Sequence, residues 1–145
     1  MALQNSNLFA ESFSVIKTFL QNLDGLDTRN RYKKNFIHSS MPNLNDKGFN
    51  GYPFIVLRSD VEEDMKSFDR DTSNKVFRIT IQIYSNEPTE IDTMSDLIMN
   101  NFKDETKLTD FPSREISNSP INWDLDLNGK KILYRTIGLI FKTRL

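Results

Sequence analysis

The sequence contains no cysteine and one histidine, His38, among its 145 residues. The absence of cysteine excludes disulfide bonds, thiolate nucleophiles and zinc sites built from cysteine. Ser39 and Ser40 adjoin His38, but neighbours in sequence do not make a catalytic triad, so we interpret His38 as a loop or partly packed residue. A glycine-rich phosphate loop and a dinucleotide-binding fingerprint are also missing. These absences predict a protein that is not an enzyme and that uses no cofactor or metal.

A charge excess and long apolar runs are missing as well. Nineteen Lys and Arg residues nearly balance 20 Asp and Glu residues, which leaves a formal net charge of −1. No overall electric field therefore attracts the chain to DNA or to a membrane. No stretch reaches the roughly 18 apolar residues of a membrane helix, and the start, MALQNSNLF, lacks the features of a signal peptide. We expect a soluble intracellular product, or part of a particle assembled in a reducing cytosol.

Residues 6–23 have the apolar spacing of an amphipathic helix. Ser6 or Asn7 can cap its first turn, and Gly25 can end it in a left-handed conformation. The apolar face has to be buried against another element of the fold. Its members are Phe9, Phe13, Ile16, Leu20 and Leu23, widened by Val15 and Phe19.

A strand and then a second helix are predicted between residues 77 and 104. The strand alternates the apolar residues Phe77, Ile79, Ile81 and Ile83 with the polar residues Arg78, Thr80 and Gln82. This alternation predicts one buried and one solvated face. Asn86 or Thr89 can cap the helix, and Pro88 suits its first turn. The helix is expected to bury Ile91, Met94, Leu97, Ile98 and Phe102.

Further strands are predicted from an apolar run and a hairpin signal. Residues 52–59, YPFIVLRS, form a short apolar run bounded by turn residues. The dipeptide Asn128-Gly129 is a strong hairpin-turn signal. The strand before this turn places Trp123, Leu125 and Leu127 on one face. The strand after it, residues 130–144, has apolar residues on both faces and is predicted to lie centrally in a sheet.

Length and pattern together predict one domain of the α+β class over residues 1–145. We expect an antiparallel or mixed β-sheet of about four to five strands with two main helices packed on one face. Long loops are expected at 24–52 and 60–74. The second of these is acidic, and we interpret it as a loop or as a solvated extension of a strand.

The acidic segment also suggests two kinds of metal site. Residues 69–80 begin like a calcium loop, but Asn74 stands where glycine is needed and Thr80 where the bidentate glutamate is needed. A metal-dependent nuclease could use Asp60, Glu62, Glu63, Asp64 and Lys66. Such a centre requires carboxylates from two elements, whereas these residues lie in one apparent loop. A solvated acidic segment is the simpler interpretation.

The order of the predicted elements resembles that of the tail terminator, or tail completion, proteins of long-tailed bacteriophages. The residues that carry the resemblance are Pro53-Phe54-Ile55-Val56-Leu57 and Ile79-Thr80-Ile81-Gln82-Ile83-Tyr84-Ser85, followed by the helix from about Glu90 to Phe102. This order covers nearly the whole chain. The segments 24–52 and 60–74 have no counterpart in the family pattern.

The resemblance implies a structural virion protein at the head-proximal end of the tail, assembled in the host cytoplasm. Family members form hexameric rings that cap the tail tube, end its polymerisation and join the tail to the head connector, and they can be monomeric before docking. The implied partners are further copies of the chain, the major tail tube protein and the connector protein. DNA would pass through the ring without specific binding, and no membrane is involved.

The implied ring needs contact residues, and the charged segments are the candidates. RNRYKK, residues 29–34, is basic and could meet the acidic DVEED, residues 60–64, of the next subunit, or both could lie free in solvent. The candidate contact residues are Arg29, Arg31, Tyr32, Lys33, Lys34, Asp60, Glu62, Glu63, Asp64, Arg78 and Gln82.

Two other functional classes stay open at this stage: a cytosolic adaptor module and a metal-dependent nuclease. A monomer that ignores tail tube protein would favour the adaptor. Magnesium-stimulated nuclease activity that is lost on changing Asp64 and Lys66 would favour the enzyme.

Overall fold

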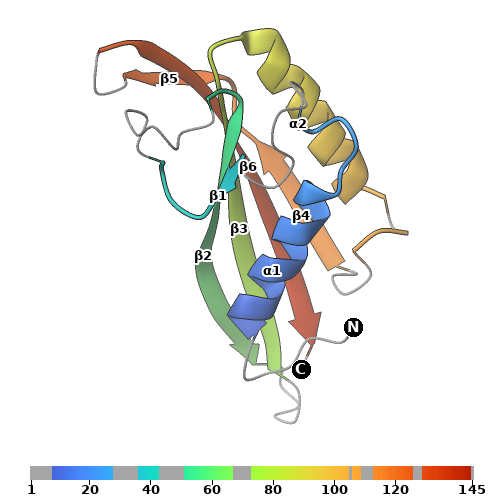
Figure 1. The fold of residues 1–145 in the computed structure, drawn as a ribbon. Coiled ribbons are helices and arrows are strands. Elements are labelled where there is room, and N and C mark those ends of the chain that lie inside the picture. The colour runs from blue at the N-terminus through green and yellow to red at the C-terminus, as the bar shows by residue number, and fades with distance from the viewer. Residues whose placement is uncertain are drawn as a thin grey trace.

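The computed structural model describes most of the chain, namely residues 8–27, 36–42, 51–66, 73–104, 106–108, 113–125 and 129–144. In chain order its elements are α1 (Leu8–Gln21), β1 (Ile37–His38), β2 (Phe54–Lys66), β3 (Ser73–Ser85), α2 (Pro88–Phe102), β4 (Ser113–Asn118), β5 (Asn122–Leu125) and β6 (Lys131–Arg144). The two helices and the strands belong to the α+β class, as the sequence pattern predicts (Figure 1).

The strands form one six-stranded mixed sheet, which is larger than the predicted four to five strands. Its order is β1-β2-β3-β6-β4, and β5 also pairs with β6. The β1 strand runs parallel to β2, and all other pairs are antiparallel. The β6 strand has neighbours on both sides, so the prediction that the last strand is central is confirmed.

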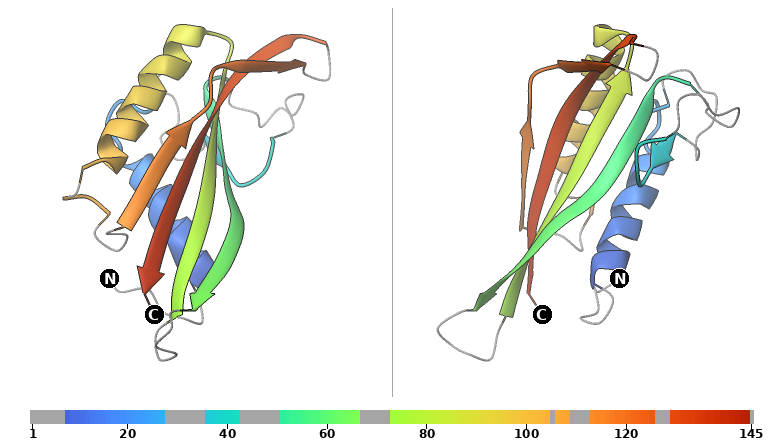
Figure 2. Two further views of the ribbon diagram at one scale, coloured as in Figure 1. Left: turned by 180° about the vertical axis from the view of Figure 1, so that it is seen from behind. Right: turned by 90° about the vertical axis from the view of Figure 1, so that its left-hand side faces the viewer.

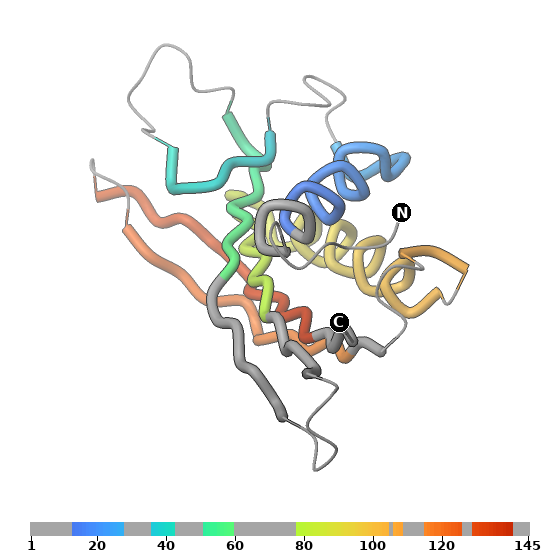
Figure 3. The backbone as a smooth tube through the Cα atoms, turned by 90° about the horizontal axis from the view of Figure 1, so that it is seen from below, coloured from blue at the N-terminus to red at the C-terminus, as the bar shows by residue number. Residues whose placement is uncertain are grey.

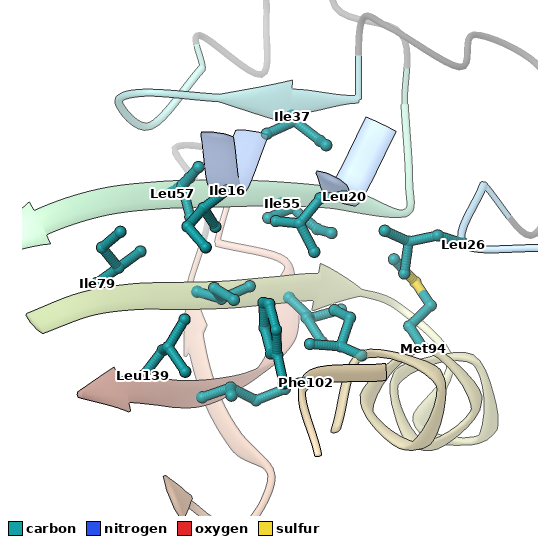
Figure 4. Close-up of a cluster of buried hydrophobic side chains, with 14 of the residues drawn as sticks. Ile16, Leu20, Leu26, Ile37, Ile55, Leu57, Ile79, Met94, Phe102 and Leu139 are labelled. Atoms are coloured by element: carbon teal, nitrogen blue, oxygen red, sulfur yellow. The ribbon is translucent and has the colours of Figure 1, made fainter. Parts of the chain in front are cut away.

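Both helices pack on the same face of the sheet, as predicted (Figures 2 and 3). The hydrophobic core lies between the sheet and the two helices, and it is built from one face of the strands and the apolar faces of the helices (Figure 4). The helices contribute Ile16, Leu20, Ile91, Met94, Ile98 and Phe102, and the strands contribute Ile37, Ile55, Leu57, Ile79, Ile81, Ile83, Ile137 and Leu139. The opposite face carries no helix among the described residues, and we call it the helix-free face.

Strand β3 shows why the local pattern predicts its orientation. Successive side chains of a strand point to opposite faces, so Ile79, Ile81 and Ile83 all reach the helices and are buried. At about 25 cal/mol for each Å² of apolar surface removed from water, this burial is a main source of stability. Arg78 lies on the other face and is exposed, as predicted.

The loop interpretation of residues 60–74 is wrong for most of that segment, and the alternative of a strand extension is correct. Strand β2 continues to Lys66, β3 already begins at Ser73, and the two strands pair up to that point. A register shift between Ser59 and Glu62 marks a β-bulge. Backbone hydrogen bonds to β3 stabilise this extension of β2. Backbone hydrogen bonds do not require an alternating apolar pattern, so no such pattern marks the extension in the sequence.

The start of α2 differs from the predicted cap. The N-cap position is Glu87, and its side chain makes no capping hydrogen bond. The hydroxyl oxygen of Ser85 instead accepts a hydrogen bond from the Glu87 backbone N–H at 3.1 Å and donates one to Glu90 Oε1 at 2.6 Å. The predictions of Asn86 or Thr89 as the cap are therefore wrong, whereas Pro88 does stand in the first turn.

Candidate interaction surface

One end of the helix-free face is covered by a row of stacked aromatic side chains. We call Tyr52, Phe54, Tyr84 and Tyr134 the aromatic row. Sheet register brings them together, because Phe54 pairs with Tyr84 and Tyr84 pairs with Tyr134. The ring centroids of Phe54 and Tyr84 are 4.9 Å apart with the planes at 8°, and those of Tyr84 and Tyr134 are 5.4 Å apart.

The aromatic row makes this end of the face a second small core. Phe54, Val56, Tyr84 and Ile132 are all buried there. The expectation that this side of β3 is solvated is therefore wrong at Tyr84. Because the rings of Phe54 and Tyr84 lie face to face with their neighbours, those ring faces are not free to stack on a base or a sugar. The row consequently serves to stiffen the sheet.

Two titratable groups at the row, Tyr84 and His38, have shifted pKa values. Burial raises the pKa of Tyr84 above its ordinary 10.0, and the nearby Tyr134 and Asp124 raise it further against the opposing effect of Arg58. Tyr84 therefore stays a neutral hydroxyl, which donates a hydrogen bond to Gln82 Oε1 at 3.3 Å.

His38 lies half-buried in β1, edge-on to the ring of Phe54 with the centroids 5.9 Å apart. Burial lowers its pKa below 6.5, and the positive charge of Lys17 lowers it further. The imidazole is consequently neutral at pH 7. This placement agrees with the prediction of a partly packed histidine.

Next to the aromatic row, the helix-free face is lined by uncharged polar residues and a glycine. Gln82 pairs with Thr136, and Thr80 pairs with Gly138. Gln82 and Thr80 are half-buried. A Cβ atom on Gly138 would stand 2.9 Å from the hydroxyl oxygen of Ser117, so the glycine lets β4 lie close to β6.

A hairpin of β5 and β6 extends beyond the part of the sheet that the helices cover (Figures 1 and 3). Trp123 and Leu125 occupy the same face of β5, as predicted, but their side chains are 59% and 56% exposed. The ammonium group of Lys131 lies 5.2 Å from the centre of the Trp123 ring. Large apolar side chains that stay exposed are typical of contact surfaces.

The structure places only some of the predicted contact residues. Arg78 and Gln82 lie together on the helix-free face. Asp60, Glu62, Glu63 and Asp64 lie on β2, and their side chains are outside the described part. Arg29, Arg31, Tyr32, Lys33 and Lys34 are outside the described residues. The pairing of the basic and acidic segments therefore stays a prediction.

The metal-site hypotheses rest on residues at or beside a gap in the described chain. Residues 67–72, which include the first four residues of the calcium-like segment 69–80, lie outside it. Within the described ranges, no group of three or more His, Asp or Glu residues is placed to hold a metal ion. No helix in those ranges has the length and apolar content to cross a membrane.

The aromatic row is the feature of this surface that sequence reasoning missed. Tyr84 stands at a polar position of the alternating pattern in β3, and Phe54 belongs to an apolar run that supplies side chains to both faces of β2, which is the available signal. Their meeting depends on register between strands far apart in the chain. No known family model matches this chain, and comparison with curated proteins finds no match either.

Proposed function

We propose that the protein is a tail terminator, or tail completion protein, of a long-tailed bacteriophage. In this role copies of the chain form a ring that caps the tail tube, ends its polymerisation and joins the tail to the head connector. The proposal extends the resemblance in element order. The observation that carries it is the combination of the two edges of the described sheet with the uncharged polar centre of the helix-free face.

The sheet edges suit ring formation. A ring requires two different contact surfaces on each subunit, so that every copy meets its neighbours head to tail. Among the described residues, the sheet ends in β4 on one side, and on the other side β1 covers two residues of β2. Strand edges present backbone N–H and C=O groups that favour pairing with another chain. Trp123 and Leu125 add exposed apolar area near the β4 edge.

The helix-free face suits a water-filled channel. Its central positions hold Thr80, Gln82, Thr136 and Gly138, which carry no charge. Tight DNA binding comes mainly from many Lys and Arg contacts to phosphates. Because these central positions are uncharged, and the exposed Arg58 and Arg78 share the face with Glu115, we expect DNA to pass without being held. DNA is thus a passenger in this proposal, and the partners are the tube protein, the connector and further copies of the chain.

The proposal is tested by reconstitution with the major tail tube protein encoded in the same genome. Tubes polymerised with the chain present should be shorter and should carry a ring at one end in electron micrographs. An equal amount of heat-unfolded chain is the control. Tubes of unchanged length with bare ends would contradict the proposal and favour the adaptor class. Magnesium-dependent degradation of DNA by the purified chain would favour the nuclease class.

A further inference from the structure

The edge strands β4 and β2 lie at the same height along the strand direction of the sheet. Following the register across the sheet, Asn118 of β4 lies level with Ile137, Ile81 and Leu57. The other end of β4, Ser113, lies level with Glu63 of β2 in the same way. The β4 strand therefore spans the level of β2 residues 57–63. Strand β1 pairs with Ile55 and Val56 and ends before that stretch begins.

The directions of β2 and β4 also allow the two edges to pair between copies. Each of the three steps β2–β3, β3–β6 and β6–β4 is antiparallel, so β4 runs opposite to β2. A second copy placed beside the first, with its helices on the same side, therefore sets its β2 antiparallel to β4. Antiparallel pairing is the more stable of the two arrangements for each residue. The joined sheets keep one helical and one helix-free side, as a ring around a channel requires.

Opposite charges stand at these edges on the helix-free face. Arg58 of β2 pairs with Thr80, and Ser117 of β4 pairs with Gly138, which puts all four residues on that face. Glu115 lies two positions from Ser117 and therefore shares its face. Both Arg58 and Glu115 are exposed. Residues opposite or diagonal to each other on paired strands are within reach of long side chains.

We infer that β4 of one copy pairs antiparallel with β2 residues 57–63 of the next copy, with Glu115 of the first beside Arg58 of the second. The partner at this edge is thus a second copy of the chain, and the inference rests on the proposed ring. The contact is heterologous, because a different edge is used on each copy. Repeated around the ring, it closes the assembly and covers the edge of β4 and the edge of β2 residues 57–63 in every copy.

Engineered cysteines test the contact directly, since the chain has none of its own. The variant R58C/E115C, treated with a short bis-maleimide, should give a ladder of covalent multimers that ends at one closed size. Within one copy the two positions are three strand spacings, about 14 Å, apart, so a short linker cannot join them internally. R58C alone and E115C alone should stop at the monomer. Monomer as the only product of the double variant, with the tail tube protein present as well as without it, overturns the inference.

Charge reversal tests the pairing of Arg58 with Glu115. Arg58→Glu should raise the concentration at which multimers form by about fivefold, because like charges then oppose each other across the strands. Glu115→Arg should do the same, and the double reversal should restore the wild-type value. Asp96→Arg, on the exposed surface of α2, is the matched control and should change nothing. Single reversals without effect, or a double reversal that restores nothing, overturn the pairing.

Failure of this inference and failure of the proposed function are distinguishable. Rings that cap tubes but give no cysteine ladder would leave the function standing and refute the edge pairing. A closed ladder from a chain that neither binds nor shortens tubes would support the edge pairing and refute the tail function. A variant R58C/E115C that caps tail tubes but gives no ladder, either free or on the tube, would refute the edge pairing alone.

Discussion

Arg135 of β6 and Asp92 of α2 form an ion pair in which Nη1 and Oδ1 are 2.9 Å apart. The same guanidinium donates from Nε to the backbone carbonyl of Ser119 at 3.1 Å. The Ser119 hydroxyl in turn accepts the backbone N–H of Thr136 at 3.1 Å. One arginine therefore connects α2, the central strand and the link between β4 and β5.

We expect Arg135→Ala to lower the free energy of unfolding by about 2 kcal/mol, because it removes the charged hydrogen bond to Ser119 as well as the ion pair. Asp92→Asn should cost less than about 1 kcal/mol, since the Asp92 side chain is 55% exposed and exposed pairs contribute little. Urea unfolding of both variants measures this difference. Equal losses would mean that the ion pair, rather than the Ser119 contact, carries the effect.

Ser85 is expected to act as the functional cap of α2. Ser85→Ala removes the acceptor for the Glu87 N–H and the donor to Glu90 and should cost about 1–2 kcal/mol. Thr89→Ala is the matched control, because Thr89 is the cap that the sequence pattern predicts and its side chain is exposed. Its effect on urea unfolding should stay below about 0.5 kcal/mol. A larger loss for Thr89→Ala than for Ser85→Ala would contradict the cap geometry.

The aromatic row should contribute strongly to stability. Phe54 is 1% exposed and stacks on Tyr84, so Phe54→Ala should lower the free energy of unfolding by about 3–5 kcal/mol. Phe54→Leu keeps most of the volume and should lose less. Trp123→Ala is the exposed aromatic control and should change stability by less than about 0.5 kcal/mol. A stability loss for Trp123→Ala as large as for Phe54→Ala would contradict the assignment of the row as a core.

His38 predicts a pH dependence of stability. Its pKa in the folded chain is lowered from 6.5 by burial and by Lys17, so the unfolded chain binds the proton more readily. Stability should be complete above the unfolded pKa and should fall as the pH decreases below about 6.5, until the folded pKa is passed. His38→Asn should make the urea midpoint less dependent on pH between about pH 5.5 and 7, a range above that in which the carboxylates titrate.

Lys17→Gln is the companion variant for this test. It removes the smaller of the two causes of the lowered pKa and should reduce the slope of stability against pH without abolishing it. A slope that is the same in the wild type, His38→Asn and Lys17→Gln would show that other groups dominate the acid response.

The predicted elements succeed where a periodic apolar pattern is long. The helix ending at Phe102 and the alternation of Ile79, Ile81 and Ile83 follow from side-chain geometry that holds for any helix or strand. The predictions fail where the cause is a distant partner. The extension of β2 to Lys66 depends on β3, and the cap of α2 depends on how Ser85 leaves the sheet.

The same distinction between local pattern and distant contacts applies to the residues of the candidate interaction surface. The polar character of Arg78, Thr80 and Gln82 is visible in the alternating pattern. The aromatic row and the matched sheet edges are not visible there, because they depend on which strand lies beside which.

Two amphipathic helices, a strand that must bury one face, the α+β class and the absence of cysteine chemistry all follow from the amino-acid order, because apolar spacing specifies local structure and its buried side. The strand order, the stacking of Phe54 on Tyr84 and the opposing edges formed by β2 and β4 arise when the chain folds. Those features come from hydrogen bonds and contacts between residues far apart in the chain, which a local pattern does not encode.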